Sequence, residues 1–158
     1  MEYEISPDYM PISPRALRTD TTVGCDIYIL AKTSIEVRFV LYCKPDAVFD
    51  VAKKSMLLAQ RIKSLFIKKE EQKVFFDYLE NNFQLILTDT SIPPDERSKI
   101  VHGAATNLVK DLYNDPRSGS VERTKTFANN MVDYVLKDTK AAESLIDIAV
   151  HEYYIFWP

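Results

Sequence analysis

The chain has 158 residues, of which 46% are hydrophobic and 27% charged, and its formal net charge is −3. This composition supplies enough apolar material for a folded core and excludes a disordered chain. The mild negative charge argues against nucleic acid as a partner, because nucleic-acid binding calls for a basic stripe. No apolar run approaches the ~18 residues that a membrane span requires, so no membrane span is predicted.

The N-terminal residues and the cysteines indicate where the protein works. The start of the chain, Met1 to Glu4, is acidic and lacks the basic and apolar regions of a signal peptide. The two cysteines, Cys25 and Cys43, have no metal-site spacing. We expect both to be reduced and buried in strands as small hydrophobic residues. These features predict a soluble cytoplasmic protein.

Strand signals dominate the first part of the chain. Pro7, Pro11 and Pro14 punctuate an extended lead-in. Residues 25–30 and 37–42 are rich in β-formers and are joined across residues 32–34, which predicts a hairpin. Residues 65–67, Leu-Phe-Ile between basic residues, fit a third strand returning to the same sheet.

From Pro45 onward the apolar residues recur every three or four positions, which is typical of amphipathic helices. The first predicted helix carries apolar residues from Val48 to Ile62, with Asp46 as its cap. Four more are predicted: residues 69–88, a helix that starts within 91–96 and ends before Asp115, residues 121–137, and a last helix capped by Thr139. The pattern predicts an α+β fold: a small antiparallel sheet lobe with one helix in residues 1–68, then about four helices in residues 69–158.

The sequence offers no complete catalytic or metal-binding motif. His102 and His151 are far apart and have no metal-ligand partner three or four residues away. The chain has only three glycines, which excludes a glycine-rich phosphate loop. We therefore predict no catalytic residue, no metal site and no cofactor.

Arg15 and Arg18, followed by a threonine-rich segment, form the one candidate ligand site. Paired guanidinium groups can grip phosphates in two-point hydrogen bonds. A solvated loop before the first strand is the other interpretation of the same residues.

The chain ends in an aromatic segment that contains Tyr153, Tyr154, Phe156 and Trp157. A chain end is usually polar and frayed. We expect these aromatic residues either to dock onto the helices or to form the junction with a further domain.

The order of these features is similar to that of a known family. The features are the run Cys25 to Ile29, Val40 to Tyr42, Leu65 to Ile67, Phe76 to Asn82, Pro94 to Val101, and the closing Tyr153-Tyr154. Together they resemble the region that precedes the catalytic domain in a group of bacterial HD-GYP proteins. The resemblance implies a parent protein that is a metal-dependent phosphohydrolase acting on cyclic di-GMP.

The resemblance carries over no active-site residue. HD-GYP catalysis uses a His-Asp pair among its metal ligands, whereas His102 is followed by Gly103 and His151 by Glu152. We therefore expect a non-catalytic regulatory region that couples a signal or partner to an HD-GYP-like domain in cis. The alternatives are a stand-alone nucleotide-binding module that uses Arg15 and Arg18, or an interaction module that forms a homodimer.

Overall fold

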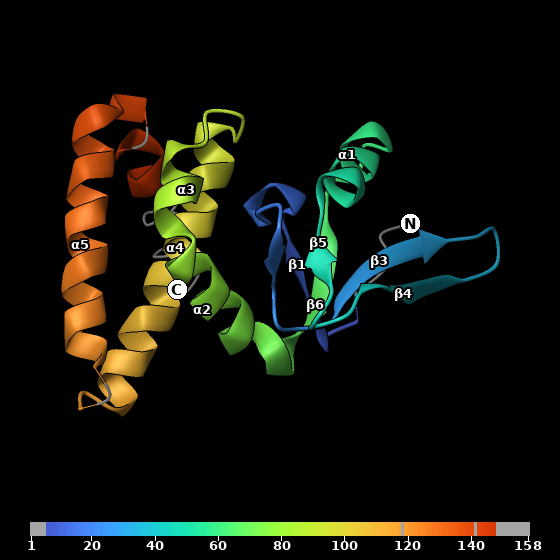
Figure 1. Cartoon of the computed structure of the whole chain (residues 1–158), viewed down its shortest axis with the longest axis horizontal. Coiled ribbons are helices and arrows are strands. Elements are labelled where there is room, and N and C mark those ends of the chain that lie inside the picture. Colours follow the sequence, from blue (N-terminus) through green and yellow to red (C-terminus); the bar gives the residue numbers. More distant parts are fainter. Residues whose placement is uncertain (1–5, 118, 141, 148–158) are drawn as a thin grey trace, which may run out of the picture. The chain divides into compact units, whose positions relative to one another are not determined.

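The computed structural model describes residues 6–117, 119–140 and 142–147. The chain divides into two compact units, with the boundary between Tyr78 and Leu79. We call them the sheet unit and the helical unit. The fold is α+β, as predicted: a four-stranded antiparallel sheet and a two-stranded sheet are followed by helices (Figure 1).

The main sheet has the strand order β1-β6-β3-β4, with β1 at Tyr9–Ile12, β6 at Leu65–Lys68, β3 at Ile27–Lys32 and β4 at Val37–Cys43. All neighbouring strands are antiparallel. The predicted hairpin is confirmed, and its turn is closed by hydrogen bonds between Thr33 and Glu36. The predicted strand at residues 65–67 is also confirmed. It is an inner strand with Leu65, Phe66 and Ile67 all buried, which explains its unbroken apolar run.

The proline-rich lead-in contains a strand that the sequence did not reveal. Residues of β1 pair with β6 from Tyr9 opposite Lys68 to Ile12 opposite Leu65. Pro11 is tolerated there because β1 is an edge strand, in which alternate N–H positions face away from the neighbouring strand. After β1, residues Pro14–Ala16 form a 3-10 turn, η1.

The first predicted helix is shorter than expected, and its predicted cap is wrong. Helix α1 runs over Val51–Ala59, and the Asp50 carboxylate accepts a hydrogen bond from the Lys53 N–H at 2.8 Å. Val48–Phe49 instead form strand β5, which pairs with β2 at Thr21–Thr22. This pairing removes the two residues before Asp50 from the helix, so Asp46 lies too early in the chain to cap it.

The end of α1 also has a local cause. Arg61 adopts a left-handed conformation with φ 55, and the Ile62 N–H donates to the Leu57 carbonyl at 3.0 Å. This bond closes the helix in the manner of a Schellman motif. Ile62 therefore lies outside the helix.

The predicted helix over residues 69–88 is interrupted. A 3-10 turn at Lys69–Glu71, η2, leads into α2 at Gln72–Asn81, and α3 follows at Phe83–Thr88. Asn82, with φ −106 and ψ 13, breaks the helix between them. Tyr78 is buried with the sheet unit and Leu79 with the helical unit, so α2 contains the boundary between the two units.

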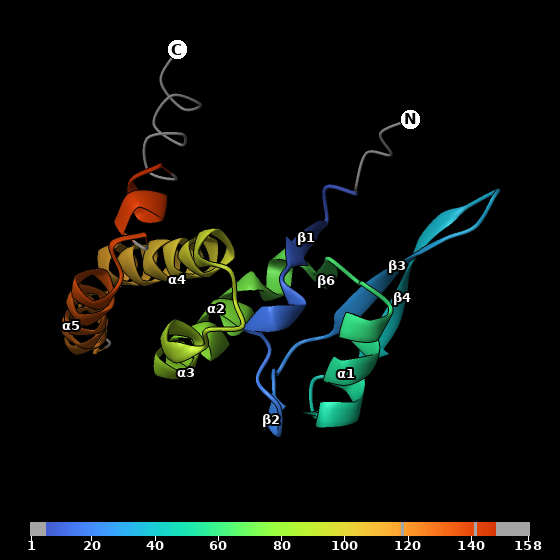
Figure 2. The same cartoon turned by 90° about the horizontal axis from the view of Figure 1, so that it is seen from above.

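The helical unit is built on two long helices. Helix α4 spans Pro94–Asn114 and α5 spans Ser120–Lys137, as their start and stop signals predicted. They lie side by side in both views (Figure 1, Figure 2). The unit's core contains Leu79, Phe83, Ile86, Ile92, Val101, Leu108 and Phe127. Residues 139–140 and 142–147 of the last predicted helix are helical. Its predicted cap, Thr139, is wrong: Thr139 is itself helical, and the Asp138 carboxylate accepts from the Lys140 N–H at 3.0 Å. Residue 141 and the residues after 147 lie outside the described part of the chain.

Candidate functional site

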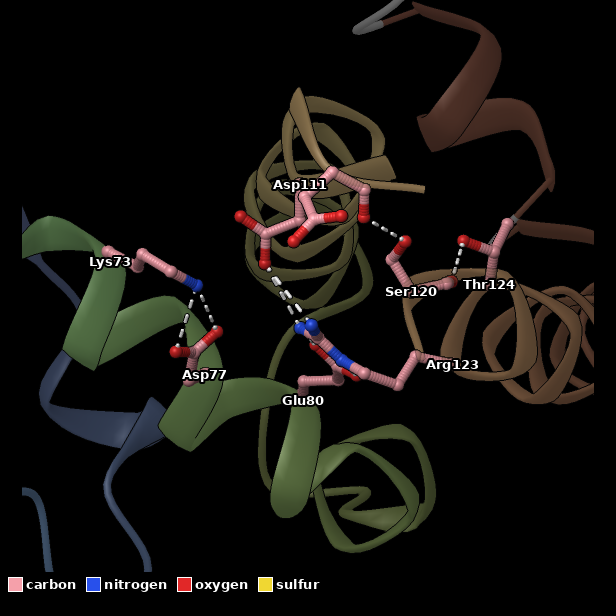
Figure 3. A network of polar contacts seen from close by, with 8 residues as sticks. Lys73, Asp77, Glu80, Asp111, Ser120, Arg123 and Thr124 are labelled. Carbon is pink, nitrogen blue, oxygen red and sulfur yellow. Dashed lines mark hydrogen bonds and ion pairs between the residues drawn. The ribbon is translucent and has the colours of Figure 1, made fainter. Parts of the chain in front are cut away.

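A network of charged side chains centred on Arg123 crosses the helical unit (Figure 3). The guanidinium of Arg123 donates to both carboxylate oxygens of Glu80, from Nε at 2.8 Å and from Nη2 at 2.6 Å. It also donates to one oxygen of Asp111 at 3.3 Å from both Nη1 and Nη2. One arginine therefore joins α2, α4 and α5.

Each member of this network lies at the unfavourable end of its own helix. Arg123 is in the first turn of α5, where the helix dipole presents positive charge. Glu80 and Asp111 are in the last turns of α2 and α4, where it presents negative charge. No local preference favours these placements, so the network depends on tertiary structure. The ion pairs offset the unfavourable interaction of each charge with the dipole of its own helix.

Burial makes the network stronger than a surface ion pair. The side chains of Glu80 and Asp111 are each 16% exposed and that of Arg123 is 35% exposed. Hydrogen bonds to Glu80 raise the pKa of Arg123 above its usual value. Two-point arginine–carboxylate contacts are among the strongest polar contacts in proteins. The network is therefore a structural clamp.

A cleft of about 450 Å³ lies beside this clamp and is lined entirely by residues of the helical unit. Phe83 and Phe127 pack in it with ring centroids 4.4 Å apart. The Gln84 amide donates to the Asn130 carbonyl oxygen at 2.5 Å. The remaining lining residues are Glu80, Asn81, Glu122, Arg123 and Thr126. The cleft combines an aromatic wall with amide and carboxylate groups, and its arginine is already engaged by two carboxylates.

Within the part of the chain that the structure describes, no group of three or more His, Cys, Asp or Glu side chains could hold a metal ion. Among the described helices, none is both long and apolar enough to cross a membrane. Cys25 and Cys43 are both free and buried. Cys43 ends strand β4, as predicted, whereas the prediction of a strand position for Cys25 is wrong because β3 begins only at Ile27.

The predicted ligand residues Arg15 and Arg18 lie around the 3-10 turn η1 in the sheet unit. The Arg18 residue is only 9% exposed, and its guanidinium donates to the Arg15 carbonyl. The structure thus assigns Arg18 a contact within the turn. A phosphate-binding role for the two arginines stays a prediction.

Tyr78 ties helix α2 to this turn. The Arg18 N–H donates to the Tyr78 hydroxyl at 2.8 Å. The Thr21 hydroxyl lies 2.8 Å from the same oxygen and donates to the Arg18 carbonyl at 2.7 Å. Because the Thr21 hydroxyl proton is used in the bond to the Arg18 carbonyl, the Tyr78 hydroxyl is the donor in its contact with Thr21. The tyrosine both accepts and donates in a buried position, so it fixes the turn to α2.

The aromatic residues Tyr153, Tyr154, Phe156 and Trp157 lie outside the described residues, as does His151. The alternatives proposed for them are untested by the structure.

Comparisons with known proteins give one similarity. No protein-family model matches the chain, and no curated protein matches it. One solved structure, Bd1817, a HDG"Y"P protein from Bdellovibrio bacteriovorus, aligns with 89% of this chain and 45% of its own, at 20% identity and a TM-score of 0.44. The chain spans less than half the length of that protein. A similarity at this level establishes neither a family nor a function.

Sequence reasoning did not single out the clamp around Arg123. Its partners lie 43 and 12 residues away in the chain. Part of a signal was present, because Asp111 and Arg123 oppose the dipoles at the ends of their predicted helices. Glu80 gave no such signal, since it lies in the interior of the predicted helix over residues 69–88 and reaches a helix end only through the break at Asn82.

Proposed function

We propose that the chain is a non-catalytic regulatory region of an HD-GYP-type protein. Its sheet unit receives a signal or partner, and its helical unit passes the change to a catalytic domain elsewhere in the same protein. The family part of this proposal rests on the order of sequence features from Cys25 to Val101 and at Tyr153-Tyr154. That domain would be a metal-dependent phosphohydrolase acting on cyclic di-GMP.

The continuity of α2 across the boundary between the units is the observation that carries the regulatory part. Tyr78 in this helix is hydrogen-bonded to the η1 turn of the sheet unit through Arg18 and Thr21. Glu80, two residues later, is held by Arg123 of the helical unit. Tyr78 and Glu80 are two residues apart in one helix, so the polar contacts of the two units meet there, and α2 is the element through which we propose that a signal passes.

Three features of α2 make it a responsive element. Besides its apolar packing, it makes a directional polar contact on each side of the boundary, at Tyr78 and at Glu80. Its last turn is followed at once by the break at Asn82. Glu80 depends on an arginine from another helix for its stability at the helix end. A change at the η1 turn that shifts Tyr78 would therefore act on the clamp.

The natural gene provides the test of the family assignment. We expect the reading frame that encodes this chain to encode a His-Asp pair and a Gly-Tyr-Pro triplet downstream of it. A complete reading frame without these motifs would contradict the proposal.

A second experiment tests the non-catalytic role. The purified 158-residue chain, supplied with Mn²⁺ or Fe²⁺, is expected to leave cyclic di-GMP intact. Efficient metal-dependent hydrolysis by this chain would contradict the proposal even if the downstream motifs were present.

A further inference from the structure

The outer face of α5 carries an apolar stripe that no described residue covers. The stripe consists of four apolar residues, Val121, Ala128, Val132 and Leu136, and of Lys125 among them, all of them exposed. At 100° per residue these positions fall within an arc of about 80°. The buried residues of the helix, Ser120, Phe127 and Tyr134, lie on another face. We refer to the first set as the α5 stripe.

The apolar members of the stripe are substantially exposed: Val121 is 41%, Val132 57% and Leu136 77% accessible. The steps between successive members are four, three, four and four residues. Steps of three and four residues keep side chains on one face of a helix, as packing of two helices along a shared seam requires. The stripe is therefore shaped for another helix.

We propose that the α5 stripe pairs with the α5 stripe of a second copy of this chain, with the two helices antiparallel. The charges on the face select this partner and this direction. Lys125 and Asp133 each lie four residues from Asn129, on opposite sides of it. In an antiparallel pair centred on Asn129, each Lys125 is level with Asp133 of the second copy. A parallel pair would instead set the two Lys125 ammonium groups against each other.

The side of the helix on which these charges lie is consistent with that pairing. Viewed along the helix axis, Lys125 and Asp133 are both rotated in the same direction from the middle of the stripe. The two-fold axis that relates two antiparallel helices leaves these residues of both copies on the same side of the contact. Both Lys125–Asp133 ion pairs therefore form on that side. The same α5 face thus complements itself in charge as well as in apolar pattern.

The ion pair of Lys125 within its own chain is too weak to prevent an ion pair with Asp133 of the second copy. Its ammonium lies 3.4 Å from the Glu122 carboxylate, and the two side chains are 67% and 78% exposed. Such exposed pairs contribute little. In the dimer, Lys125 would lie between Glu122 of its own chain and Asp133 of the second.

The seam extends over about four helical turns, which puts the contact at the small end of specific interfaces. We therefore expect a dimer that dissociates on dilution. This inference is independent of the proposed regulatory function, because it depends on α5 alone.

Sedimentation of the full chain over a wide range of concentrations tests the proposal. The wild-type chain is expected to shift from monomer to dimer as concentration rises. Val132→Asp is expected to remain a monomer with unchanged helical circular dichroism. The matched control is Val109→Asp, on α4 outside the stripe, where the valine is 60% exposed. It is expected to dimerise like the wild type.

A charge exchange tests the direction of the pair. Lys125→Asp and Asp133→Lys should each weaken the dimer severalfold, and the double variant should recover most of the loss. A wild-type chain that stays monomeric would overturn the proposal. So would equal effects of the Val132 and Val109 substitutions, or a double variant as weak as the single ones.

Discussion

The guanidinium of Arg123 and the carboxylate of Glu80 meet in a two-point contact with N–O distances of 2.8 and 2.6 Å. Asp111 approaches the same guanidinium at 3.3 Å. The contact joins the last turn of α2 to the first turn of α5, at ends where the helix dipoles would repel these charges. The clamp is thus a tertiary feature that holds the last turn of α2, from Leu79 onward, in the helical unit.

Removing the arginine should destabilise the helical unit. Arg123→Ala leaves two carboxylates that are each only 16% exposed without their shared cation. We expect the free energy of unfolding to fall by about 1–3 kcal/mol, the range for removing one partner of a partly buried charged contact. Urea titration followed by circular dichroism measures it. Lys125→Ala, which removes an exposed pair, should change stability by less than about 0.5 kcal/mol at a protein concentration where the chain is a monomer. Equal effects of the two substitutions would contradict the clamp.

Tyr78 offers a test of the contact between α2 and the η1 turn. Tyr78→Phe keeps the ring but removes the hydroxyl that accepts from the Arg18 N–H. We expect a loss of about 1–2 kcal/mol, because a buried N–H is left without its acceptor. The control is Tyr113→Phe, at a tyrosine that is 88% exposed. Thermal unfolding should show a lower midpoint only for the first variant, and unchanged midpoints for both would disprove the role of the hydroxyl.

Alanine substitutions at two glycines of similar backbone conformation distinguish the cost of backbone strain from the cost of a steric contact. Gly24 has φ +88 and Gly119 has φ +82, so alanine is strained at either position. A Cβ on Gly24 would lie 3.2 Å from Cγ1 of Val74, whereas one on Gly119 meets nothing within 4 Å. Gly119→Ala should cost about 1–2 kcal/mol, and Gly24→Ala should cost more. Paired denaturation curves provide the measurement, and the reverse order would contradict the packing of α2 on Gly24.

The buried thiol of Cys25 predicts a loss of stability in alkali. Burial raises the pKa of Cys25 to about 12, and the nearby Glu71 carboxylate adds to the shift. An unfolded thiol titrates near pH ~8.5, so the unfolded chain releases this proton first. The stability contributed by the group is complete below that pH and is lost as pH rises toward 12. In reducing buffer, Cys25→Ala should therefore lose less stability than the wild type between neutral and strongly alkaline pH. Parallel pH profiles would argue against a buried neutral thiol.

Asp50 and Asp46 provide a matched pair for the start of α1. Asp50 caps the helix through the Lys53 N–H, and this hydrogen bond lowers the pKa of its carboxyl. Asp50→Ala should lower the melting temperature, whereas Asp46→Ala should leave it unchanged. Because the folded pKa is lowered, the effect of Asp50→Ala should disappear at acidic pH, where the carboxyl is protonated in both states. A larger effect of Asp46→Ala than of Asp50→Ala would contradict the cap at Asp50 and support Asp46 as the cap, as the sequence predicted.

The elements that the sequence predicted correctly are those with strong local signals. The β3–β4 hairpin, the apolar strand β6 and the helices α4 and α5 each combine a clear periodicity with a turn or cap signal nearby. Pro94 with its following acidic residues is one example. Such signals act within one or two turns of chain, so no tertiary knowledge is needed to recognise them.

The elements that the sequence missed depend on distant partners. Strand β1 forms because Tyr9 pairs with the region of Lys68, and Val48 leaves the expected helix because it pairs with Thr22. The break at Asn82 has neither glycine nor proline to announce it. The apolar face continues from α2 into α3 across this break, which is why one long helix was expected. The clamp was missed for the same reason, since the partners of Arg123 lie on other helices.

Hydrogen exchange on the full chain tests the coupling through α2 most directly. Tyr78→Phe loosens a contact inside the sheet unit, and Tyr113→Phe is its control. If α2 transmits the change, amides of α4 and α5 in the helical unit will exchange faster in Tyr78→Phe than in the wild type or in Tyr113→Phe. Faster exchange confined to the sheet unit, with α4 and α5 unchanged, would contradict the proposed regulatory role.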